Sequence, residues 1–135
     1  MALLPMLFVL WSALESTVAA TTVNSIAALR TAISDNTIPR ILVAAGTYAF
    51  TDRMPGCLRS ALCINRTVTI EAVSHGTVVF DAQAGGRCDH FGDGAHMRVI
   101  HVRLGSSDVV ELIGMAVTGG REWTQKDFDR CLTPI

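Results

Sequence analysis

The feature that most limits the fold is a series of short β-branched runs separated by turn residues, which begins at Ile41. The runs occupy residues 41–43, 45–48, 68–70, 78–80, 99–102, 109–113 and 115–117. They are too short for helices and rich in Val and Ile, which favour strands. Half of all residues are hydrophobic (50%), as a buried, strand-rich core requires.

The spacing of these runs predicts a repeat. Val68 and Val78 are 10 positions apart. Val99 and Val109 repeat that interval 31 positions further along the chain. We therefore expect a strand pair to recur, with a Gly-rich excursion between the copies, as in a solenoid whose turns bury their core against one another. A β-sandwich with irregular loops is the alternative that the spacing leaves open.

A short amphipathic helix is predicted just before the first strand. Asn24 or Ser25 can cap it, and its apolar stripe consists of Ile26, Leu29 and Ile33. The open end of a solenoid exposes an apolar interior and unpaired strand edges. Because the helix lies directly upstream of the first strand, we expect it to cover that end.

The first twenty residues have the character of a secretory signal peptide. An apolar run over residues 2–11 is followed by a more polar stretch and by small residues at 18–20 that suit a cleavage site. The positive charge usual near the start is missing, and a membrane anchor or a buried helix are the alternatives. No later stretch is apolar enough over the roughly 20 residues that a membrane span needs, so we expect no span after signal removal.

Cysteines and a sequon agree with export to an oxidising compartment. The four cysteines are an even number, as expected where disulfides persist: Cys57, Cys63, Cys88 and Cys131. Cys57 and Cys63 flank a short loop, so we expect a local disulfide between them, with Cys88 and Cys131 as the remaining pair. Asn65 begins an N-glycosylation sequon, Asn-Arg-Thr, and is the predicted glycosylation site.

Five segments in a fixed order carry a family resemblance. They are IAALRTAI (26–33), ILVAAGTY (41–48), RTVTIE (66–71), TVVFD (77–81) and LIGMAVTGG (112–120). In this order they resemble the pectate-lyase-like right-handed parallel β-helices, especially extracellular proteins with polymorphic-membrane-protein-like repeats. The resemblance implies an all-β fold, with a short N-terminal capping α-helix and the first coils of a right-handed parallel β-helix at 21–120. The predicted signal peptide at 1–20 precedes this domain, and an irregular tail at 121–135 lies outside the family pattern.

The lyases of that family hold calcium with clustered carboxylates and abstract a proton from an acidic sugar with a basic residue. Glu71, Asp81 and Glu111 fall in different segments, and calcium takes about six to eight oxygen ligands. We interpret these carboxylates as ordinary solvent-facing or turn residues. The loop at 88–96 holds two His, two Asp and a Cys, but its spacing matches no zinc or calcium motif, which favours a solvated insertion.

Other chemistry has little support in the sequence. His75 and His101 stand alone and are predicted to lie at the surface or the edge of the core. No nucleophile elbow, P-loop or dinucleotide fingerprint is present, so we expect no cofactor, no metal and no catalytic residue. With a net charge of -1 and 17% charged residues, the chain has no basic field for nucleic acid.

Two functions remain open. The one we favour is a noncatalytic secreted or cell-surface protein, adhesive or structural, that binds extracellular glycans or surface proteins through its long face. The alternative is a fragment of a polysaccharide lyase or glycoside hydrolase whose active site lies in coils that this chain lacks. The strand pattern stops after Gly120, so we expect a fragment; a short capping tail that contains Trp123 and Phe128 is the competing interpretation.

Overall fold

The structure is a computed structural model and describes residues 19–57, 59–83 and 98–120. In order, the elements within these ranges are β1 (Ala20–Val23), α1 (Ile26–Ser34), β2 (Arg40–Val43), β3 (Gly46–Ala49), β4 (Ser60–Ile64), β5 (Val68–Ala72), β6 (Val78–Asp81), β7 (Arg98–Val102), β8 (Val110–Ile113) and β9 (Met115–Thr118). The loop at 88–96, the tail at 121–135 and most of the predicted signal peptide lie outside the described residues.

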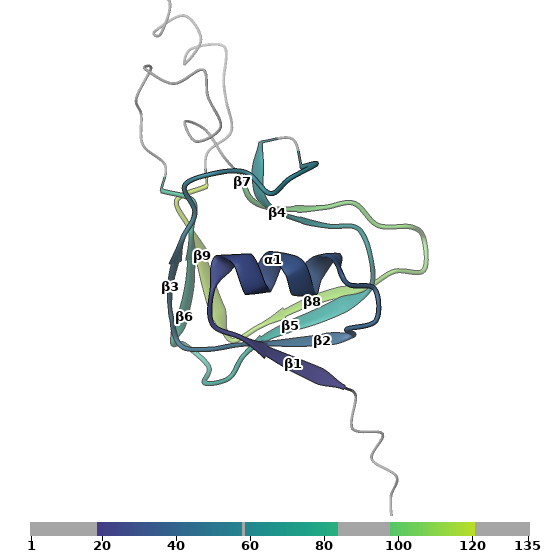
Figure 1. The fold of residues 1–135 in the computed structure, drawn as a ribbon, viewed down its shortest axis with the longest axis horizontal. Coiled ribbons are helices and arrows are strands. Elements are labelled where there is room, and N and C mark those ends of the chain that lie inside the picture. The colour runs from purple at the N-terminus through teal and green to yellow at the C-terminus, as the bar shows by residue number, and fades with distance from the viewer. Residues whose placement is uncertain (1–18, 58, 84–97, 121–135) are drawn as a thin grey trace, which may run out of the picture.

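The strands form three parallel sheets with the orders β1-β2-β5-β8, β3-β6-β9 and β4-β7. From β2 onward the chain contributes one strand to each sheet in turn, and we call one such round a passage. Consecutive strands therefore belong to different sheets, and strands of neighbouring passages pair with one another. Figure 1 shows the sheets around a common interior, with α1 lying across it. The predicted β-rich class with one short helix is therefore present.

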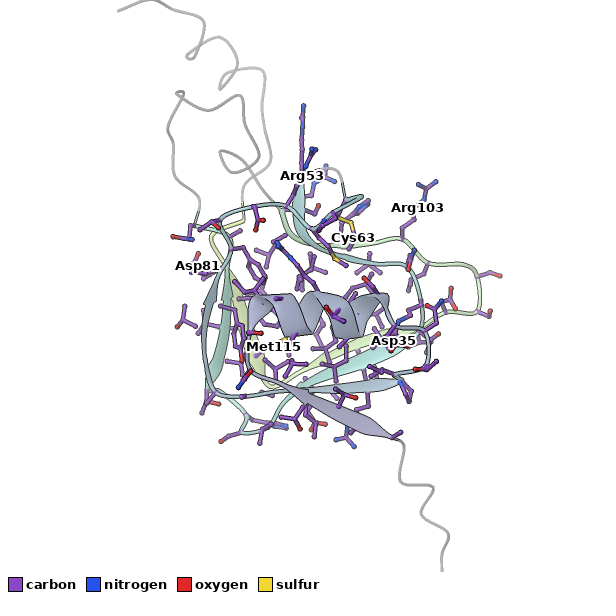
Figure 2. The ribbon with its side chains drawn as sticks, in the orientation of Figure 1. Asp35, Arg53, Cys63, Asp81, Arg103 and Met115 are labelled. Atoms are coloured by element: carbon purple, nitrogen blue, oxygen red, sulfur yellow. A yellow bond between two sulfur atoms is a disulfide. The ribbon has the colours of Figure 1, made fainter. Side chains whose placement is uncertain are left out.

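The core consists of side chains that point from the sheets into this interior. In the longest sheet, Ile41 of β2 pairs with Ile70 of β5, and both side chains are fully buried. In the β3-β6-β9 sheet, Tyr48 pairs with Phe80, and their rings meet edge to face with centroids 5.7 Å apart. Matched apolar side chains thus stack from one passage to the next. Figure 2 shows side chains pointing into the interior around α1.

The predicted 31-residue repeat is wrong. Val68 pairs with Val110 of β8 and not with a residue of β7, and Val78 pairs with Met115. The strand that contains Val99, β7, pairs with β4 instead. The sequence reasoning assumed excursions of equal length, whereas the register offset is 29 positions between β2 and β5 and 42 between β5 and β8.

The predicted helix is present, and within its apolar stripe Leu29 and Ile33 are buried while Ile26 is partly buried. The Ser25 side chain caps it by accepting a hydrogen bond from the backbone N–H of Ala28 at 3.1 Å. Leu29 is fully buried, and Ile33 is buried beside it. The helix contacts β1, β2 and β4, so it covers the interior at the N-terminal end, as expected.

The C-terminal end of α1 is held by Arg66, which comes from the corner between β4 and β5. Its guanidinium donates to the backbone carbonyls of Ala32 (2.9 Å), Ile33 (2.8 Å) and Ile38 (2.7 Å). The last turn of α1 contains no basic residue of its own. Arg66 therefore supplies from 33 positions away the positive charge and the donors that the end of a helix favours.

Two glycines allow the chain to turn where no side chain fits. Gly114, between β8 and β9, has φ +74°, and a Cβ atom there would meet the His75 ring at 2.6 Å. Gly119, after β9, has φ +69° and its Cβ would meet the backbone nitrogen of Gln83 at 2.8 Å. Both positions therefore require glycine.

The end of the interior opposite the helix is open within the described residues. Leu112 points inward in register with Ile70, yet it is 40% exposed. Val117 is aligned with buried Phe80 and is 48% exposed. These side chains continue the apolar stacks of the core, but no further described strand lies over them.

Candidate functional site

The outer face of the β1-β2-β5-β8 sheet carries a cluster of polar side chains. Burial alternates along β2 and β5, so every second residue points outward. The register aligns these outward residues in two rows: Ala20, Arg40, Thr69 and Glu111 in one, and Thr22, Leu42, Glu71 and Ile113 in the other. Because the strands are parallel and in contact, residues of the two rows lie on one continuous surface.

Glu71 is the centre of the cluster. Its Oε2 atom accepts a hydrogen bond from Arg40 Nη2, and its Oε1 atom lies 3.1 Å from His75 Nε2. His75 comes from the turn after β5, four residues beyond Glu71. The hydrogen bond from His75 and then that from Arg40 lower the pKa of the Glu71 carboxyl below its ordinary value. The carboxylate is therefore ionised and held between two basic groups.

This geometry leaves the two basic groups open to ligands. The His75 side chain is 61% exposed and that of Arg40 is 41% exposed, whereas Glu71 beneath them is only 18% exposed. Both carboxylate oxygens of Glu71 already accept hydrogen bonds, which disfavours direct binding of a cation by this residue. The cluster can instead offer N–H donors to hydroxyl or carboxylate groups of a ligand.

The three carboxylates considered as a calcium site do not converge. Glu71 and Glu111 share the outer face of one sheet, in adjacent rows. Asp81 lies on β6 in a different sheet, and its Oδ1 atom accepts the backbone N–H of Gln83 at 2.8 Å. Within residues 19–57, 59–83 and 98–120, no group of three or more His, Cys, Asp or Glu could hold a metal ion. The metal candidates at 88–96 fall outside these ranges.

The remaining predicted residues lie around β4. Cys57 and Cys63 form a disulfide with their Cα atoms 5.8 Å apart, whereas Cys88 and Cys131 lie outside the described part of the chain. His101 of β7 is in register with Cys63 and is partly buried. Asn65 is exposed in the corner directly after β4.

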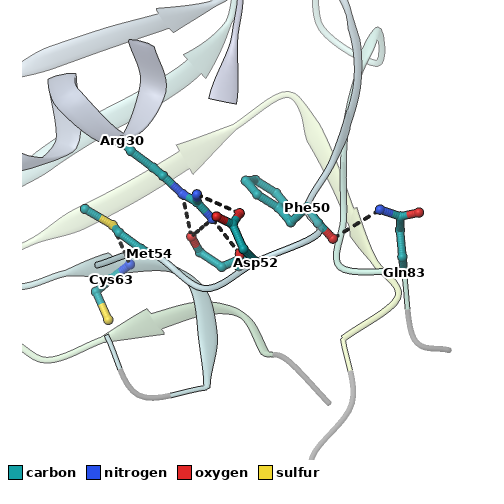
Figure 3. A network of polar contacts seen from close by, with 7 residues as sticks. Arg30, Phe50, Asp52, Met54, Cys63 and Gln83 are labelled. Carbon is teal, nitrogen blue, oxygen red and sulfur yellow. Dashed lines mark hydrogen bonds and ion pairs between the residues drawn. The ribbon is translucent and has the colours of Figure 1, made fainter. Parts of the chain in front are cut away.

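Arg30 of α1 fixes the disulfide loop relative to the helix (Figure 3). Its guanidinium bonds the Asp52 carboxylate at 3.0 Å and the Ala61 carbonyl at 3.2 and 3.1 Å. It also lies 5.7 Å from the centre of the Phe50 ring. Arg30 comes from α1, Phe50 and Asp52 from the excursion after β3, and Ala61 from β4. The network therefore holds these three parts of the chain together and is separate from the polar cluster.

Sequence reasoning missed Arg40 and the role of His75 in the cluster. Arg40 immediately precedes the predicted strand at 41–43, and His75 was taken as an isolated residue. A signal in the sequence could have revealed this face. Arg40 and Leu42 on one strand, and Thr69 and Glu71 on the other, alternate with apolar residues that are buried. Alternation of this kind places polar side chains on the outer face of a sheet.

Comparisons with known proteins add no family to this description. No family model, curated protein or solved structure matches the chain. Among the described residues, none of the helical structure has the length and apolar character of a membrane span. The fold and the contacts of the outer face are therefore the features from which a function can be inferred.

Proposed function

We propose that the protein is an extracellular, noncatalytic right-handed parallel β-helix protein that binds glycans or surface proteins through the outer face of its β1-β2-β5-β8 sheet. The observation that carries this proposal is the cluster on that face, where Arg40 and His75 flank the ionised Glu71 carboxylate. A flat, ordered array of donors is suited to recognition of a polyhydroxylated surface.

The β-helix part of the proposal is supported by the path of the chain. Parallel strands recur in three sheets, and their inward side chains stack between passages. Connections between parallel strands of one sheet are right-handed in about 98% of cases, which favours a right-handed coil. The extracellular part is supported by the Cys57–Cys63 disulfide, because disulfides persist in oxidising compartments, and by the sequon at Asn65, because N-glycosylation takes place on exported chains.

The chemistry of the cluster favours a ligand with hydroxyl or carboxylate groups. The Arg40 guanidinium donates from Nη2 to Glu71, and its Nη1 group carries further N–H donors for ligand oxygens. Its orientation is fixed from beneath by Glu71, so little side-chain freedom is lost on binding. Thr69 and Glu111, which lie in the same row as Arg40, add a hydroxyl and a carboxylate to the same surface.

The test is a binding survey with the purified 135-residue chain against neutral and acidic polysaccharides immobilised on an array. Binding by the parent chain should fall strongly in Arg40→Gln, which removes the exposed cation. Thr47→Ala is the matched control, because Thr47 is exposed on β3 in another sheet. Equal binding by the parent chain and Arg40→Gln, or no binding to any polysaccharide on the array, would contradict glycan binding by this face.

A lyase assay addresses the catalytic alternative directly. The same chain is incubated with polygalacturonate and calcium, and the unsaturated sugar released by β-elimination is measured by its ultraviolet absorbance. We expect no product. Release of unsaturated sugar that is abolished by removing calcium would replace the noncatalytic function with that of a polysaccharide lyase.

A further inference from the structure

The corner between β4 and β5 combines a modification sequence with an open side chain. Asn65 follows the last residue of β4 and is exposed. Hydrogen bonds among the described residues engage its neighbours Arg66 and Thr67, whereas none involves the Asn65 side chain. Asn65, Arg66 and Thr67 together form the N-glycosylation sequon. The acceptor amide is therefore accessible at an exposed turn.

The second recognition element of the sequon, the Thr67 hydroxyl, is also exposed, but it is already engaged in hydrogen bonds. It accepts the backbone N–H of Val109 at 3.0 Å and donates to Asp108 Oδ1 at 3.3 Å. Both sides of the corner are also held by backbone hydrogen bonds, from Arg103 N–H to the Ile64 carbonyl at 2.8 Å and from Val68 N–H to the Val109 carbonyl at 3.1 Å. Among the described residues of the folded corner the Asn65 amide is therefore free, whereas the Thr67 hydroxyl is engaged in hydrogen bonds.

We propose that Asn65 receives an N-linked oligosaccharide before this corner folds, and that pairing of the segment around Val109 then closes the sequon. The donor class is a polyprenyl-pyrophosphate-linked oligosaccharide. A bond forms between Asn65 Nδ2 and the anomeric carbon as the bond from that carbon to the pyrophosphate oxygen breaks. The amide loses one proton, and the lipid pyrophosphate is the leaving group.

The order of residues along the chain provides the interval in which this occurs. Val109 lies 42 positions after Thr67, so the hydroxyl has no partner from that strand until a much later segment has been synthesised. The contacts of Arg66 with α1 and with Ile38, in contrast, involve residues that precede it by 28 to 34 positions. The first half of the corner can therefore form while the sequon is still open.

The test uses full-length protein purified without glycans and offered to purified oligosaccharyltransferase with its lipid-linked donor. A peptide of residues 60–72 and the reduced, alkylated full chain are the open substrates. Both should gain the mass of the oligosaccharide. The folded, disulfide-bonded chain should react at least about tenfold more slowly, because only locally open molecules can present the Thr67 hydroxyl.

Variants test separately whether Asn65 is the glycosylated residue and whether folding of the corner blocks the reaction. Asn65→Gln should abolish the mass gain in every form, and Thr67→Ser should retain it, because serine keeps the hydroxyl. Val109→Pro removes the N–H that Thr67 accepts and should raise the rate of the folded chain towards that of the peptide. An unreactive peptide would overturn the site, and a folded chain that reacts as fast as the peptide would overturn the timing. This assay requires no export and no ligand, so its outcome is independent of the proposed function.

Discussion

Replacing Arg66 with methionine removes the guanidinium that holds the end of α1 while keeping an unbranched, apolar side chain. The carbonyls of Ile33 and Ile38 then lose the charged donor at 2.8 and 2.7 Å. A buried acceptor left without a donor costs about 1–3 kcal/mol. Because Arg66 is only partly buried, water can reach part of the site, and we expect a total loss of about 2–3 kcal/mol in the free energy of unfolding.

Urea unfolding followed by circular dichroism measures this loss. A domain of this kind has a total stability of about 5–15 kcal/mol and a urea dependence of about 1–3 kcal/mol per molar. The midpoint of Arg66→Met should therefore fall by roughly 1–2 M. Arg66→Lys should recover only part of the loss, because an ammonium cannot reproduce the planar fork of donors.

Arg103→Met is the matched control, since Arg103 is exposed and its side chain holds no helix carbonyl. It should change the unfolding free energy by less than about 0.5 kcal/mol. If Arg66→Met and Arg103→Met unfold at the same urea concentration, the contacts of Arg66 do not stabilise the capped end, and the reasoning fails.

Three further predictions concern the cap, the disulfide and acid stability. Leu29→Asp places a carboxylate among buried apolar groups and should lower the free energy of unfolding, measured by thermal unfolding, by more than about 3 kcal/mol. Its control, Ala27→Asp on the exposed side of the helix, should lower it by less than about 0.5 kcal/mol. Equal melting temperatures of the two variants would show that the helix does not cover the core. Thiol titration of the unreduced, unfolded protein should find Cys57 and Cys63 blocked, and replacing both with alanine should cost about 2 kcal/mol, because the bond closes a short loop; two reactive thiols there would contradict the pairing. The folded-state pKa of Glu71 lies below its ordinary value of 4.5. The stability that its ionised form contributes is therefore complete above pH 4.5 and is lost as the pH falls through the lower folded-state pKa. Glu71→Gln should flatten this acid part of the stability curve, and an unchanged curve would argue against the cluster.

The helix and most strands could be predicted because their residues have strong local patterns. The stripe of Ile26, Leu29 and Ile33 follows helical periodicity, and runs such as Val78-Val79-Phe80 combine β-branched and aromatic residues. β1 and β4 were not predicted. β1 (Ala20–Val23) has one buried residue and begins at the last residue of the predicted signal peptide, and β4 (Ser60–Ile64) has a single β-branched residue, its last.

The register and the polar cluster could not be predicted because they depend on the lengths of the excursions between strands. Equal local spacing suggested that Val68 and Val99 occupy equivalent positions, whereas Val68 is aligned with Val110. A shift in register changes which residues become neighbours across a sheet. The contact between Arg40 and Glu71 therefore emerged only once β2 and β5 had been aligned.

The edge-to-face packing of Tyr48 gives the chain an optical reporter of its own. Tyr48 is the single tyrosine of the sequence, its hydroxyl donates to the Ala44 carbonyl at 2.7 Å, and burial raises its pKa above the ordinary value of 10.0. Phenolate absorbance during an alkaline titration therefore comes from one residue in one sheet. A transition at higher pH than that of free tyrosine would report that β3 and β6 remain packed, and the same signal would reveal the moment at which they separate.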